Sequence, residues 1–309
     1  MSEHIVHTGI LEDSIAIMPY LKEIPEDFLQ AAHRHIGFAR LGCITVSGDT
    51  YSFRLLEEYK PLWKKRDDLL EAKLAFVLGW VSHRACDREM KPIWHTVEIS
   101  GRGSDANPAV SPTECSVYHE GTLYNLYYAE DPVFHLAIFP GLLADWTGAE
   151  LVNAPLMAEF VESSYAMNMM DIQTILPPSL EQQSSDQRFI EDVCLQAQKF
   201  YVDISRYTRA SSHAVPDLKK SYVIDINWYD EKDLIVELVS RLRRGESLTE
   251  SEVKKSMDNP ASSHYGRALQ LSLRYIISAA VYFTDDNMSI EALKERLDIG
   301  KKGPGGLGV

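Results

Sequence analysis

The feature that most constrains this fold is an uninterrupted apolar run, LAFVLGWV, at residues 74–81. The run has no polar face, so a helix formed there is buried on most sides, and it is too short to span a bilayer. His83 and Asp87 follow it, four residues apart and therefore one turn apart on the same helical face. We therefore expect a central buried helix that includes this stretch, residues 74–95, and carries a histidine and a carboxylate on its buried stripe.

A buried imidazole and a buried carboxylate both need partners, because leaving either unpaired inside a protein is costly. His83 and Asp87 can satisfy each other, which is ordinary for an i,i+4 pair. Alternatively, they can share a metal ion, since histidine and aspartate are common ligands. Their spacing alone does not decide between the two interpretations.

The rest of the chain is predicted to be helical. Apolar or amphipathic patterns occur at residues 8–22, 26–41, 53–66, 113–130, 151–170, 188–207, 230–244 and 262–283. We expect Pro25 to open the second of these helices and Gly42 to end it, with the central helix beginning near Asp67. The one strand candidate is the short β-branched run at residues 222–226. The prediction is a single all-α domain over residues 1–299, with a flexible tail at residues 300–309.

Composition narrows the classes of partner. The chain has 309 residues with 45 acidic and 31 basic side chains, a formal charge of −14 and a pI near 5.2. This balance disfavours nucleic acid and anionic membranes as partners, unless a bound cation assists. The N-terminus lacks the basic and apolar regions of a signal peptide, and no segment is long enough to span a membrane. We therefore expect a cytoplasmic protein.

Four cysteines are scattered along the chain without a CxxC pair: Cys43, Cys86, Cys115 and Cys194. This spacing predicts buried thiols in a reducing compartment rather than a disulfide framework or a zinc knuckle.

Several other residues are candidates for a site. Asp49 follows Gly48 in the strongest turn signal of the turn-rich stretch at residues 43–53, and is either a turn former or a ligand on a loop. Glu120 and His119 lie on neighbouring faces of the helix at residues 113–130. The residues alone favour a Glu120 that faces water and a His119 that packs in the core. His33 and His35 point to different faces of one helix and cannot both line one site.

The string AFVLGWVSHRACDREMKP at residues 75–92, with a Gly-Asp turn upstream and an acidic helix downstream, resembles the zinc-dependent phospholipase C family. That family consists of all-α metal-dependent phosphodiesterases and their relatives. The resemblance covers residues 74–92 well and is weaker over residues 1–50 and 113–131. It implies a metal site within residues 1–131, with ligands from His7, Asp49, His83, Asp87 and Glu120.

The chain departs from the family pattern at the following positions. Lys91-Pro92 stands where the family has His-Pro, and the nearest substitute, His95, lies three residues past the proline. Ser116 stands where the family has a histidine one turn before its glutamate, although His119 is adjacent to Glu120. We therefore expect one or two zinc ions rather than three, with iron or manganese as alternatives.

The resulting functional hypothesis is a metal-dependent hydrolase of a phosphodiester or related phosphate ester that uses metal-activated water. Asp49 would be a bridging ligand or general base, and Lys91 would pair with the substrate phosphate. The partner would be a small-molecule or phosphate-ester substrate, without nucleic acid or a stable membrane anchor. Two alternatives stay open: an HD-type or non-haem iron metalloenzyme acting on a small metabolite, and a non-catalytic helical binding protein that has lost metal ligands.

Overall fold

The structure is a computed structural model that describes residues 4–43, 56–57, 59–101, 112–127 and 219–301. Within these ranges the chain is helical and has no strand, so the predicted all-α class is confirmed. The helices are α1 (His4–Ile17), α2 (Glu26–Arg34), α3 (Ile36–Cys43), α5 (Asp68–Gly101), α6 (Pro112–Tyr127), α11 (Leu234–Arg243), α12 (Glu250–Asp258), α13 (His264–Thr284) and α14 (Ile290–Arg296). Between them lie two short 3₁₀ helices, η1 (Met18–Tyr20) and η2 (Lys60–Lys65), and the π-helical η4 (Lys220–Ile224).

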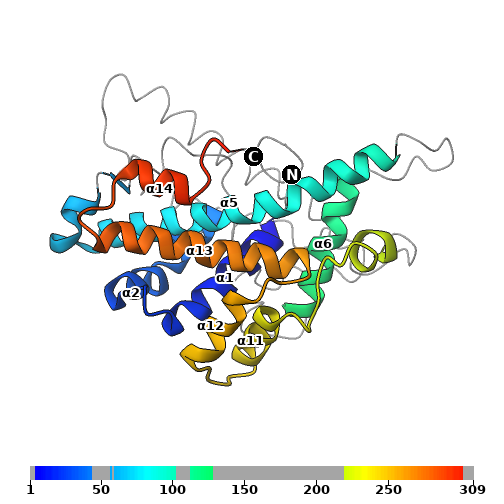
Figure 1. The fold of residues 1–309 in the computed structure, drawn as a ribbon, viewed down its shortest axis with the longest axis horizontal. Coiled ribbons are helices and arrows are strands. Elements are labelled where there is room, and N and C mark those ends of the chain that lie inside the picture. Colours follow the sequence, from blue (N-terminus) through cyan, green and yellow to red (C-terminus); the bar gives the residue numbers. More distant parts are fainter. Residues whose placement is uncertain (1–3, 44–55, 58, 102–111, 128–218, 302–309) are drawn as a thin grey trace, which may run out of the picture.

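Helix α5 is the central element of the described chain. Figure 1 shows it running across the molecule with α13 alongside, and its most extensive contacts are with α3 and α13. The apolar run is buried throughout, for example at Leu74, Val77 and Val81, so the predicted central helix is confirmed. The helix is longer than predicted, since it continues through Pro92 to Gly101.

Helices α3 and α5 touch through their backbones. A Cβ atom added to Gly79 would lie 1.8 Å from the carbonyl oxygen of Ala39, and one added to Gly42 would lie 2.0 Å from that of Phe76. Only glycine permits so close an approach. The predicted helix from Pro25 to Gly42 ends within one residue of its predicted end, since α3 ends at Cys43, but it is not continuous. It is broken at His35, whose φ of −111° and ψ of 37° are not helical.

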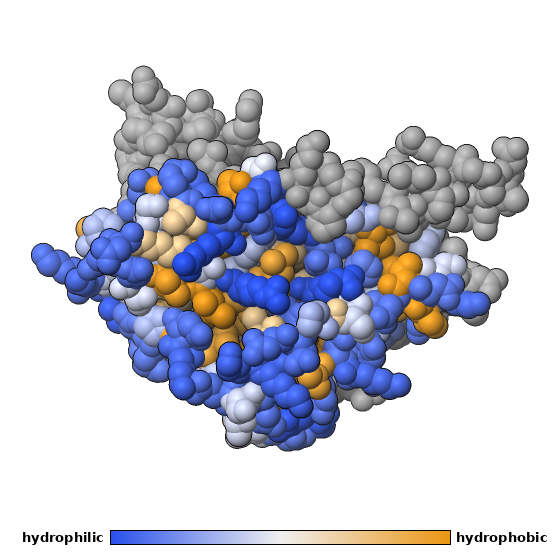
Figure 2. All heavy atoms as spheres, viewed as in Figure 1, coloured by the Kyte–Doolittle hydropathy of each residue, from blue (hydrophilic) through white to orange (hydrophobic). Residues whose placement is uncertain are grey.

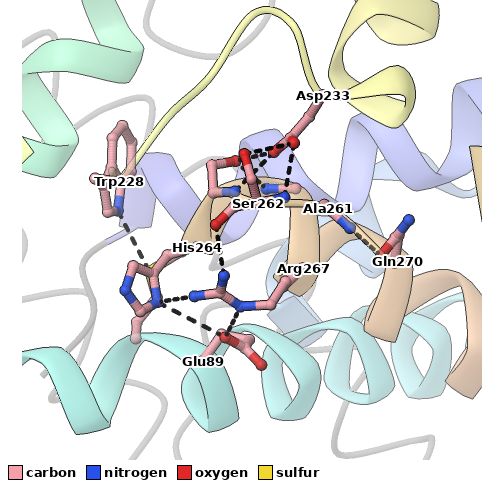
Figure 3. Close-up of polar contacts among 11 residues, drawn as sticks. Glu89, Trp228, Asp233, Ala261, Ser262, His264, Arg267 and Gln270 are labelled. Atoms are coloured by element: carbon pink, nitrogen blue, oxygen red, sulfur yellow. Dashed lines mark hydrogen bonds and ion pairs between the residues drawn. The ribbon is translucent and has the colours of Figure 1, made fainter. Parts of the chain in front are cut away.

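Polar side chains fix α13 against its neighbours (Figure 3). The Asp233 carboxylate accepts hydrogen bonds from the backbone N–H groups of Ser262 (2.7 Å) and Ser263 (2.8 Å). The Ser263 hydroxyl caps the helix by accepting from the Gly266 amide at 3.0 Å. One turn into α13, Arg267 donates to Glu89 of α5 at 3.1 Å. The start of α13 is thereby held both to the loop before α11 and to the central helix.

Three elements differ from their predictions. The β-branched run at residues 222–226 is not a strand, because η4 buries Tyr222 and Val223 against α6 in a π-helical turn. His7 lies inside α1 rather than before the first helix. Helix α12 was not predicted, although Thr249 and Glu252 form a capping box that the sequence displays.

Some predictions fall outside the described residues, namely the helices at 151–170 and 188–207 and the thiol of Cys194. The other three cysteines are buried free thiols, as expected.

Among the described helices, none combines the length and apolarity needed to cross a membrane. Figure 2 shows one face of the molecule, on which hydrophilic side chains predominate and apolar ones form smaller patches between them.

Candidate metal centre

Three side chains that are far apart in the sequence converge between α1 and α5. His7 of α1 meets His83 and Asp87 of α5, and one ligand atom from each lies within 4.8 Å of the others. His7 Nε2 is 3.5 Å from Asp87 Oδ1, and His83 Nε2 is 3.2 Å from Asp87 Oδ2. The three side chains are 2%, 12% and 9% exposed, so the cluster is almost entirely removed from water. The structure thus brings together three of the five residues that the resemblance implicates.

The contact between α3 and α5 orients the ring of His83. Its Nδ1 lies 2.9 Å from the backbone carbonyl oxygen of Cys43, and because a carbonyl only accepts, Nδ1 must carry the proton. Cys43 follows Gly42 and His83 lies one turn after Gly79, so the close approach of the two helices creates this hydrogen bond. Nε2 is then the ring nitrogen that faces Asp87, 3.2 Å from Oδ2. Metal-binding histidines are commonly oriented in this way.

The two imidazoles are stacked. Their ring centroids lie 4.3 Å apart and their planes differ by 13°. Each Nε2 therefore faces its own oxygen of the Asp87 carboxylate. An imidazole lone pair lies in the plane of its ring, and parallel planes do not converge, so one of the rings must turn for both to bind the same ion.

Asp87 carries the negative charge of the cluster. Burial alone would raise the pKa of its carboxyl group, but the charge of His83 and hydrogen bonds from His7 and His83 outweigh burial and hold that pKa well below its usual value. The carboxylate is thus ionised at neutral pH. Lys91, one turn further along α5, places its Nζ 2.7 Å from Asp87 Oδ2.

The residues present fit a divalent metal ion in chemical terms. Two imidazole nitrogens and a carboxylate oxygen are the donor types that zinc prefers, and they also suit iron and manganese. The Asp87 carboxylate is ionised, as a metal ligand must be, and the hydrogen bond from His83 Nδ1 to Cys43 leaves Nε2 as the ring nitrogen that faces the cluster.

Glu120 has a structural role, which is to hold the start of α1, the helix that carries His7. Its carboxylate is fully buried and accepts hydrogen bonds from the first amides of α1, from Ile5 N at 2.5 Å and Val6 N at 3.0 Å. The expectation that Glu120 faces water is therefore wrong. A carboxylate at a helix N-terminus pairs with unsatisfied N–H groups and with the positive end of the helix dipole. Glu120 of α6 thereby fixes the helix that carries His7, and its role as a metal ligand stays a prediction.

His119 is a core residue, as the residues alone suggested. Its Nε2 donates to the backbone oxygen of Tyr222 at 2.8 Å, and its ring stacks on Trp228 with centroids 4.6 Å apart. Burial lowers the pKa of His119 to about 3, so the ring is neutral at physiological pH.

The remaining candidates are less well placed. Asp49 lies outside the described residues, and so does the side chain of His95, whose backbone belongs to α5. The carbonyl of Cys43 was missed, because a backbone acceptor leaves no signal in the sequence.

A second cluster, of His35, Asp68 and Glu71, was also not predicted. Arg34 and Arg66 already donate to Glu71, at 2.6 and 3.1 Å, so its negative charge is compensated by the protein itself.

Comparison with family models, with curated proteins and with solved structures gives no match to this chain.

Proposed function

We propose that this chain binds a divalent metal ion through His7, His83 and Asp87 and hydrolyses a phosphate ester. The observation that carries the proposal is the hydrogen bond from His83 Nδ1 to the Cys43 carbonyl, because it directs Nε2 toward Asp87 and His7. A self-satisfied i,i+4 pair of His83 and Asp87 would not need the second histidine, His7, on the same carboxylate. The resemblance of residues 75–92 to the phospholipase C family supports the same reading.

Each residue has a distinct role in this proposal. A bound ion would supply positive charge for a phosphate oxygen and lower the pKa of a bound water. His7, His83 and Asp87 hold the ion, and Glu120 fixes α1 so that His7 stays in reach. Asp49 is the proposed general base or bridging ligand. Because the chain carries a formal charge of −14, a local positive centre is what would let it bind an anionic substrate.

The substrate class that we propose is a phosphodiester or a related phosphate ester of small size. Nucleic acid and bulk anionic membrane are disfavoured by the same net charge.

A non-catalytic helical protein is the second candidate, and the Lys91–Asp87 ion pair is the observation that favours it. With Lys91 Nζ 2.7 Å from Oδ2, the carboxylate already has a cationic partner without any metal ion. In that case His7, His83, Asp87 and Lys91 form a structural polar cluster.

Elemental analysis separates the two candidates. Protein purified without a metal-affinity column is compared with His83→Ala and Asp87→Ala. His33→Ala and Asp286→Ala are matched controls, since both residues are exposed. We expect about one or two zinc, iron or manganese ions per wild-type chain, retained in the controls and lost in both site variants. Bound iron with a visible absorption band would favour an oxygenase. A wild type that neither carries nor takes up metal would refute the proposed function.

A further inference from the structure

Lys91 occupies a position that matters for cation binding. It lies at i+4 from Asp87 on α5, and its Nζ is 2.7 Å from Oδ2, the same oxygen that His83 Nε2 approaches at 3.2 Å. The Lys91 side chain is 29% exposed, against 9% for Asp87. The ammonium group therefore reaches a nearly buried carboxylate from the solvent side.

Two cations cannot share this oxygen at low cost. A divalent ion held by His83 Nε2 and Asp87 Oδ2 would lie within a few ångströms of the ammonium. At that separation, like charges in a partly buried site repel each other strongly, because little water lies between them to screen the charges. Lys91 has an alternative, because its flexible stem and partial exposure allow the charged end to return to water. Asp87 has no such freedom, since it is buried between two imidazoles.

We propose that Lys91 is an internal counter-ion that a divalent cation displaces from Asp87, and that the displaced ammonium then binds the anionic group of the substrate. This inference rests on the proposed function and names a residue that sets both the cation affinity and the anion affinity of the same site. The ammonium stays tethered one helical turn from Asp87, so it remains close to the ion after displacement. A lysine suits this exchange better than an arginine would, because its single point charge is not fixed in a bidentate geometry.

The test is a metal titration at constant pH. Chelator-treated wild type, Lys91→Met and Lys64→Met are titrated with Co²⁺ and Zn²⁺ by calorimetry. Methionine removes the ammonium and keeps a long apolar side chain, and Lys64 is an exposed lysine of η2 that serves as the matched control. We expect Lys91→Met to bind the cation at least about tenfold more tightly than wild type, since the competing charged hydrogen bond is gone. Lys64→Met should be unchanged.

The metal-loaded proteins are then titrated with inorganic phosphate, and Lys91→Met should bind it at least several-fold more weakly. Equal or weaker cation affinity in Lys91→Met, with metal still bound by wild type, would overturn this inference and leave the proposed function standing. Unchanged phosphate affinity would overturn the substrate contact. Absence of cation binding in wild type and in both variants would overturn the inference together with the proposed function. Lys91→Gln repeats the comparison with a polar side chain, so a folding defect of one variant does not decide the outcome.

Discussion

The backbone contact between α3 and α5 makes a sharp prediction for Gly79→Ala. The new Cβ would lie 1.8 Å from the Ala39 carbonyl oxygen and 2.7 Å from the Ala39 carbonyl carbon, whereas ordinary contacts begin at 3.4 Å. Because the obstacle is backbone, no rotamer change relieves the clash, and the helices must separate locally by about 1.6 Å. Overpacking of this kind typically costs about 1–3 kcal/mol, occasionally more.

Two further effects set the net value. Alanine is the better helix former by about 1 kcal/mol, which offsets part of the clash. Separating α3 from α5 also breaks the hydrogen bond between His83 and the Cys43 carbonyl, which is worth about 1 kcal/mol. We therefore expect Gly79→Ala to lower the free energy of unfolding by roughly 2 kcal/mol, and to weaken any metal binding that depends on the orientation of His83.

Gly37→Ala is the matched control. Gly37 also lies in α3, but a Cβ added there meets nothing within 4 Å. That variant should be stabilised by a few tenths to about 1 kcal/mol, because it gains helix propensity and restricts the unfolded chain. Urea unfolding followed by far-ultraviolet circular dichroism gives both values. A Gly79→Ala protein as stable as wild type, or a Gly37→Ala protein equally destabilised, would refute the reasoning.

Three other perturbations test separate parts of the structure. Burial raises the pKa of Glu12 to about 7 despite its 2.7 Å hydrogen bond from Arg40, so the folded state holds a proton that the unfolded state releases above about pH 4.5. The free energy of unfolding should therefore fall by up to about 3 kcal/mol, through this group, as the pH rises from 4.5 to 7. Urea unfolding over this pH range should show a smaller fall for Glu12→Gln than for wild type, and an equal fall in both proteins would contradict the prediction. Glu120→Gln leaves one amide of α1 without its acceptor and should cost about 1–3 kcal/mol, measured by urea unfolding at pH 7; no measurable loss would exclude the capping role. His119→Ala should lower the free energy of unfolding by about 2–3 kcal/mol, because it loses the stacking on Trp228 and the hydrogen bond to Tyr222. The metal content per chain should equal that of wild type, and a loss of metal would show that His119 belongs to the site.

The sequence predicted the features that depend on local periodicity. The central helix was predictable because residues 74–81 have no polar face, and the pairing of His83 with Asp87 was predictable because i,i+4 residues share a face. The joining of His7 to that pair rests on tertiary packing between α1 and α5, and only the resemblance to a known family indicated it.

Other features were beyond local reasoning. A glycine near the end of an apolar pattern is usually a helix stop. Gly42 instead permits a close contact with the backbone of Phe76 in α5, and no spacing rule specifies that partner. The β-branched run at residues 222–226 indicated a strand, but the structure provides it with helix α6 as a neighbour instead. Local propensity was overridden there by the packing available.

The position of Glu120 affects how related sequences should be compared. Its carboxylate holds main-chain amides, so residues 5 and 6 can change freely as long as they stay apolar, whereas the acceptor on α6 must keep its charge and its length. Aspartate, shorter by one methylene, is not an equivalent. A glutamate at this point would thus be retained during divergence even in a descendant that had lost every metal ion. In an alignment of this lineage, an invariant glutamate here would record the anchoring of the first helix, and would not be evidence of catalysis.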